Sequence, residues 1–87
     1  MPIDNLWHST NFIFVNDDDK KEFLVRFGKN LRELRLQKGF TQEQLANELG
    51  VEISQISRIE RGIINTSITS LYSLTKILNA EIKDFFV

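Results

Sequence analysis

Residues 40–62 read FTQEQLANELGVEISQISRIERG, and they contain the signals for two short helices joined at a glycine. Thr41 followed three residues later by Gln44 has the spacing of a capping box, in which each side chain bonds to the backbone of the other residue. This spacing predicts a helix over residues 42–49. Gly50 ends that helix, because glycine adopts left-handed backbone angles without a steric penalty.

A second helix is predicted over residues 52–61, ended by Gly62. Because only Gly50 and Val51 separate the two helices, they must meet at a steep angle. A helix turns by about 100° per residue, so Ile56 and Ile59 share one side and face a core. The opposite side is small near its start and basic near its end: Ser54 and Arg61 lie at its centre, Ser57 and Arg58 beside them, and Ile53, Gln55 and Glu60 on the flanks.

Two interpretations fit this outward side. Small residues permit close approach to a DNA major groove, where Arg58 can donate a fork of hydrogen bonds to guanine and Arg61 can reach a phosphate. An ordinary solvated helix surface has the same composition. The outward residues alone therefore leave both interpretations open.

Helical patterns also precede and follow this pair. The aspartates at 17–19 favour a helix start, since carboxylates cap free amides and suit the positive end of the helix dipole, and an apolar stripe continues from there to Gly39. A fourth helix is expected after Thr66 or Ser67, and a short last helix over residues 81–86. Five helices in so short a chain predict a compact all-α unit.

The N-terminal residues have a different character. The run NFIFVN, residues 11–16, has the aromatic and β-branched composition of a short strand. A lone strand needs support, so it either pairs with a partner chain or packs as an irregular arm. We expect residues 1–18 to form an N-terminal arm and residues 19–87 to form the helical domain.

Composition narrows the class of protein. The chain has 87 residues, a formal net charge of -1 and no cysteine, so one small domain without disulfides is expected. No apolar run approaches the roughly 20 residues of a membrane span, and the N-terminal region lacks the features of an export signal, which predicts a cytoplasmic protein. The first 19 residues hold four acids and no base, which leaves the remainder with eleven basic and eight acidic residues.

At this point the sequence resembles the helix-turn-helix domains of the phage repressor and Cro type, also called the xenobiotic-response-element family. The resemblance extends over residues 27–86 and depends on three runs taken together: LRELRLQKGFTQEQLANELGV, ISRIERG and SLTKILNAEIKDFF. It implies a five-helix repressor-like domain that binds double-stranded DNA. Residues 42–49 would be the positioning helix and residues 52–61 the recognition helix.

The resemblance also implies roles for single residues. Base edges would be read by the following side chains of the recognition helix: Ile53, Ser54, Ser57 and Arg58. Ile53 could instead pack across the first helical turn. The DNA backbone would be contacted by Gln42, Gln55 and Arg61. Arg35 and Glu60 would form a partly buried ion pair with a structural role. The chain departs from the family at Glu52, where serine or threonine is usual and where a carboxylate would repel phosphate.

The expected function is a sequence-specific DNA-binding transcription regulator, a homodimeric autorepressor or operon controller. Candidate dimer contacts are the apolar C-terminal residues Phe85, Phe86 and Val87, or the arm through Phe12 and Phe14; the two phenylalanines near the C-terminus could instead pack on the first long helix. A protein-interaction module of the same fold, without operator binding, is the alternative. An enzyme, a cofactor and a metal site are not expected, because His8 is the only histidine and has no partner constellation.

Overall fold

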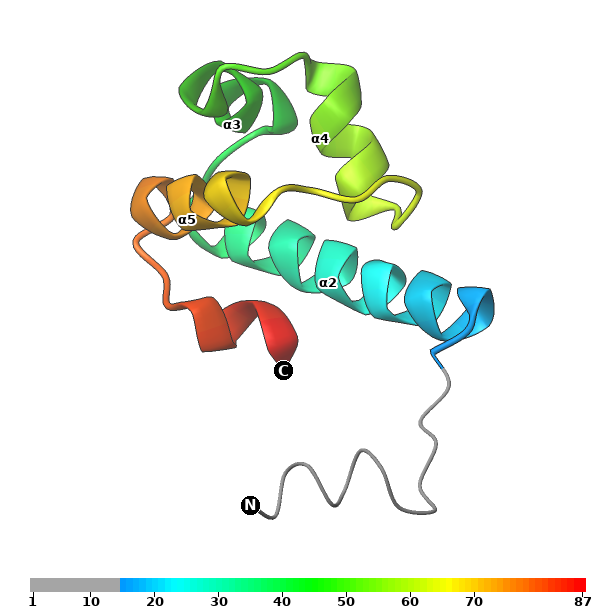
Figure 1. Ribbon diagram of the computed structural model, residues 1–87. Helices are drawn as coiled ribbons and strands as arrows, with labels where there is room; N and C mark the ends of the chain where they lie inside the picture. The colour runs from blue at the N-terminus through cyan, green and yellow to red at the C-terminus, as the bar shows by residue number, and fades with distance from the viewer. Residues whose placement is uncertain (1–14) are drawn as a thin grey trace.

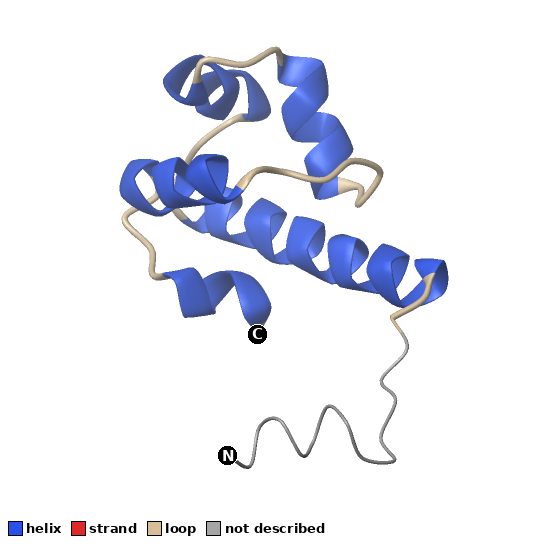
Figure 2. Cartoon of the chain, viewed as in Figure 1, coloured by secondary structure: helices blue, strands red, loops and turns tan. Residues whose placement is uncertain are grey.

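The computed structural model describes residues 15–87, and this part of the chain consists of helices and loops without a strand (Figures 1 and 2). Four α-helices are followed by one 3-10 helix: α2 (Asp17–Gln37), α3 (Gln42–Leu49), α4 (Ile53–Glu60), α5 (Ile68–Ile77) and η1 (Ile82–Phe86). The predicted all-α class and the five helical segments are confirmed, with the last segment a 3-10 helix. Most of the predicted NFIFVN strand, including Phe12 and Phe14, lies outside the described residues.

The helix α2 begins at the predicted aspartates 17–19, but its capping residue differs from the prediction. Asn16 is the capping residue: its side-chain oxygen accepts a hydrogen bond from Asp19 N at 2.8 Å, and the Asp19 carboxylate accepts one from Asn16 N at 3.3 Å. Asp17 and Asp18 therefore belong to the first helical turn, where they suit the helix dipole, and not to the arm. An asparagine caps as well as an aspartate because both offer a side-chain oxygen.

The long helix α2 is the element on which the fold is built. It packs against α4 and against η1, while α3 contacts both α4 and α5 (Figure 1). Nine apolar residues from all five elements form the buried core: Phe27, Leu31, Leu45, Ala46, Ile56, Ile59, Leu74, Leu78 and Phe85. Because α3 and α4 each contribute core residues, their orientation is fixed relative to α2.

The C-terminal residues pack on α2. The Phe85 ring is fully buried and stacks on the Phe27 ring, with 5.6 Å between the ring centroids. The Asn30 side-chain amide donates hydrogen bonds to the carbonyl oxygens of Phe85 at 2.9 Å and Val87 at 3.1 Å. Of the two placements left open for Phe85, packing on the first long helix is confirmed, and its ring completes the core of its own chain instead of contacting a second chain. Phe86 and Val87 stay exposed.

Candidate nucleic-acid interface

A tight turn joins α3 to α4. Gly50 has φ 78°, and the amides of Gly50 and Val51 both donate hydrogen bonds to Ala46 O, at 2.9 and 3.0 Å. A Cβ added at Gly50 would meet no atom within 4 Å, so the turn needs glycine for its backbone angles and not for space. The predicted capping box between Thr41 and Gln44 is also present at the start of α3.

The two sides of α4 differ as its periodicity predicts. At most 1% of Ile56 and Ile59 is exposed, and both residues pack in the core and hold the helix there. Ser54 and Arg58 are exposed on the other side. The other residues of this segment that were predicted to contact DNA differ in exposure. Ile53 and Arg61 are exposed, whereas Gln55 and Ser57 are half-buried. The free surface of α4 is thus centred on a serine and two arginines, without cover from the described part of the chain.

The first turn and the end of α4 have modest internal contacts. Glu52 precedes the helix as its cap residue but makes no side-chain capping hydrogen bond. Its exposed carboxylate lies at the helix start, where serine or threonine is usual in the family that the sequence resembles. At the other end, Arg61 Nε donates a hydrogen bond to Ser57 O at 3.3 Å. The Arg61 guanidinium remains at the surface, where it can turn toward an anion.

The Arg35–Glu60 ion pair is present and more deeply buried than the sequence suggested. Arg35 Nε donates to Glu60 Oε2 at 2.6 Å and Arg35 Nη2 donates to Glu60 Oε1 at 3.1 Å, so the guanidinium grips the carboxylate with two bonds. Only 7% and 3% of the two side chains are exposed. Arg35 Nη1 also donates to Phe40 O at 2.9 Å, which ties the loop before α3 to the same pair.

Gln42 joins this network. Its side-chain Nε2 donates a hydrogen bond to Glu60 Oε1 at 3.0 Å, and the residue is half-buried. Glu60 therefore links the end of α2, the start of α3 and the end of α4. Sequence reasoning placed Gln42 at the DNA backbone and missed this inward bond, which connects residues 18 apart in the chain.

Gly28 is a further structural residue that sequence reasoning missed. It lies inside α2, and a Cβ at this position would lie 2.6 Å from Glu60 O and also collide with Ile59 O. The glycine lets the backbones of α2 and α4 touch, which brings Arg35 and Glu60 within bonding distance. A glycine within a helical pattern was the available signal, since such a residue often marks a close packing contact.

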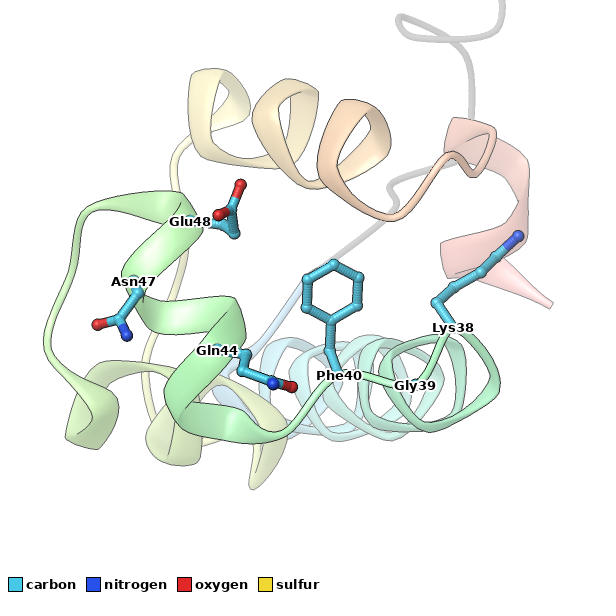
Figure 3. A pocket seen from close by; sticks show the side chains of 6 residues that line it. All are labelled: Lys38, Gly39, Phe40, Gln44, Asn47 and Glu48. Atoms are coloured by element: carbon cyan, nitrogen blue, oxygen red, sulfur yellow. The ribbon is translucent and has the colours of Figure 1, made fainter.

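A surface pocket of about 410 Å³ lies beside α3. Figure 3 shows the Phe40 ring and the α3 side chains Gln44, Asn47 and Glu48 around it. No residue of α4 lines the pocket, so it is separate from the exposed side of that helix. Its lining holds one carboxylate and one lysine with no histidine or cysteine, which offers no arrangement for acid–base or metal chemistry.

Two negative findings concern residues 15–87. Within this range, no group of three histidine, cysteine, aspartate or glutamate residues is placed to hold a metal ion. None of the helices described is long and apolar enough to cross a membrane.

The relatives of this chain agree with the geometry of α3 and α4. A family model described as helix-turn-helix matches residues 31–85. An HTH-type transcriptional regulator of Archaeoglobus fulgidus is 39% identical over 57 residues, which is 66% of this chain and 81% of that protein. The control protein C.BamHI of Bacillus amyloliquefaciens is 39% identical over 59 residues, 67% of this chain and 73% of its own length.

Solved structures extend the likeness to three dimensions. The restriction-modification controller protein C.AhdI from Aeromonas hydrophila superposes with a TM-score of 0.74 and 40% identity, over 78% of this chain and 99% of that chain. The wild-type controller protein C.Esp1396I superposes with a TM-score of 0.65 and 36% identity, over 74% and 84% of the two chains. On this shared sequence and fold, the chain belongs to the Cro/C1-type helix-turn-helix family of DNA-binding transcription regulators.

Proposed function

We propose that this chain acts as a homodimer in the cytoplasm, where it binds a two-fold related operator and controls transcription of a compact operon without catalysing a reaction. The observation that carries the proposal is the position of Ser54 and Arg58, exposed on a helix whose opposite side is buried by Ile56 and Ile59. A rigidly held helix with a small, basic outer side can enter a major groove.

The roles of single residues follow from their exposure. We assign the principal base contacts to Ser54 and Arg58, because both side chains are free. Half-buried Ser57 and exposed Ile53 would complete the base-reading set. Phosphate contacts are assigned to three residues: Gln42, Gln55 and Arg61. The Gln42 side chain already donates a hydrogen bond to Glu60. The phosphate contact at this position would therefore come from the backbone amides at the start of α3.

Dimer formation is proposed because a single small module makes too few base contacts for useful affinity. Phe86 and Val87 support it, since 42% and 78% of these apolar residues at the end of the chain are exposed. Control of a compact operon is supported by the names of C.BamHI and C.AhdI, which are control and controller proteins. The match to C.AhdI covers nearly all of that protein.

A mobility-shift titration with DNA from upstream of the chain's own gene tests the proposal, with an equally long scrambled duplex as the matched control. We expect preferential binding to the upstream fragment and an affinity that falls steeply with salt, because phosphate contacts release counterions. Equal binding to both duplexes would contradict sequence-specific control. No shift at low salt would instead favour a protein-interaction module, an alternative to which the acidic Glu52 at the α4 start lends some support.

A further inference from the structure

The first half of α2 forms one wall of an apolar groove. Two hollows of about 470 and 170 Å³ adjoin each other and share the residues Phe23, Leu24 and Asn65. The larger begins at Val15, where the described chain starts. The smaller continues toward α5 and η1, and its further apolar lining consists of Phe27, Ile68, Leu71 and Phe86.

The groove presents a continuous apolar surface. The rings of Phe23 and Phe86 stack with their centroids 5.7 Å apart, and 54% and 42% of these residues remain exposed. Ile68, on the α5 side, is 81% exposed. Scattered apolar side chains are ordinary on a protein surface, but a connected group that lines a groove indicates a binding surface.

The chain itself supplies a suitable occupant beside the groove. Residues 11–14, which lie outside the described range, read NFIF, so three of the four side chains are apolar. They directly precede Val15, which already lines the groove. A segment tethered at that point is present at a high effective concentration, so even a weak contact with the groove is populated.

The dimensions agree with this placement. From Asp17, where α2 begins, to Phe23 the helix rises about 9 Å, at 1.5 Å per residue. Four extended residues span about 13 Å, at roughly 3.3 Å each. Residues 11–14 are therefore long enough to follow the groove from Val15 past Phe23.

The same part of the chain provides one wall of the groove and its proposed occupant. The helix-turn-helix match begins at residue 31, so Phe23, Leu24, Phe27 and the NFIF segment all precede it. We propose that residues 11–14 fold back on their own chain and dock in the groove between α2, the start of α5 and η1. Docking covers Phe23, and it leaves the segment unavailable for pairing with a second chain.

A paramagnetic label tests this docking. The chain has no cysteine, so Ile68→Cys gives a single attachment point for a nitroxide on the groove. We expect the amide NMR signals of residues 11–14 to lose most of their intensity. Glu43→Cys, on α3 and outside the groove lining, is the matched control and should leave these signals unchanged. Equal intensities with both labels would overturn the proposal.

Two further samples test whether the signal loss depends on the groove and arises within one chain. Phe23→Ser combined with the label at position 68 should restore the signals, while circular dichroism checks that the helices remain. In a mixture of isotope-labelled chains without nitroxide and nitroxide-labelled chains without isotope, the signals should stay intact. Signal loss in the mixture would place the segment on a second copy and overturn docking on the same chain. DNA binding is not part of the readout, so this result leaves the proposed function untouched.

Discussion

Arg35 Nε lies 2.6 Å from Glu60 Oε2, although the two residues are 25 positions apart in the chain. Both side chains are almost completely buried, and Gln42 completes the bonding of the carboxylate. The charge pair and Gln42 therefore link α2, α3 and α4 in addition to the contacts of the apolar core. Because Glu60 belongs to α4, the pair helps to hold the helix whose exposed side carries Ser54 and Arg58.

Glu60→Ala should lower the free energy of unfolding by about 3 to 5 kcal/mol, because it leaves the Arg35 charge buried without its partner. Urea denaturation followed by circular dichroism measures the change. Lys83→Ala is the control, since it breaks the exposed pair between Lys83 and Glu81, whose atoms lie 3.4 Å apart, and should cost less than about 1 kcal/mol. A similar loss of unfolding free energy in both variants would show that the buried pair contributes no more to stability than the exposed pair.

Gly28→Ala should destabilise the protein by about 1 to 3 kcal/mol, because the new Cβ would collide with backbone oxygens of Ile59 and Glu60. Helix propensity alone predicts the opposite, since alanine is favoured over glycine by about 1 kcal/mol inside a helix. The sign of the change in the thermal midpoint thus separates the two effects. Lys29→Ala, at the exposed neighbouring position of α2, should change stability by less than about 0.5 kcal/mol.

The parts of the fold that depend on local signals were predictable. The capping box at Thr41 and the glycine at position 50 mark helix ends through bonds between residues close in sequence. Periodicity likewise assigned Ile56 and Ile59 to the core and Ser54 and Arg58 to the surface. These features need no knowledge of which helices touch.

The contacts between residues far apart in the sequence were harder to predict. The Arg35–Glu60 pair came only from the family resemblance, because two residues 25 apart leave no local pattern. The inward bond of Gln42 and the close contact at Gly28 require the packing of α2 on α4, which the sequence does not specify by periodicity. For Phe85 the sequence left two placements open, because an apolar C-terminal segment has the same pattern whether it packs on its own helix or on a partner chain.

Thr66→Val should raise the free energy of unfolding by up to about 1 kcal/mol. The Thr66 hydroxyl oxygen is buried and has no hydrogen-bond partner among the described residues, so a methyl group of similar shape removes a desolvation cost. Thr75→Val is the matched control: its hydroxyl donates to Tyr72 O, and the substitution should lower stability by about 0.5 to 1.5 kcal/mol. Urea titrations of both variants measure the change in the free energy of unfolding. A lower stability of the Thr66→Val variant would indicate that the Thr66 hydroxyl makes a hydrogen bond in solution.

Removal of residues 1–14 should leave the molecular mass in solution at that of a dimer, because these residues are proposed to dock on their own chain. Light scattering over a range of concentrations measures the mass. The truncation stops before Asn16, so that the capping box with Asp19 and the whole of α2 are kept. A fall to monomer mass on truncation would assign the dimer contact to the arm instead of to the apolar C-terminal residues.

Arg58→Ala should weaken binding to the preferred operator by about 1 to 3 kcal/mol and relax the preference at one base pair, as expected for an arginine that bonds to a guanine edge. Selection of sites from random DNA by the wild-type and variant proteins measures both effects. Arg61→Ala is the matched control on the same helix side. It should weaken binding to all sequences alike and reduce the salt slope by about one unit, because a phosphate contact carries no sequence information. An equal loss on every sequence for Arg58→Ala would move Arg58 to the phosphate-binding group and leave Ser54 as the main base-reading residue of α4.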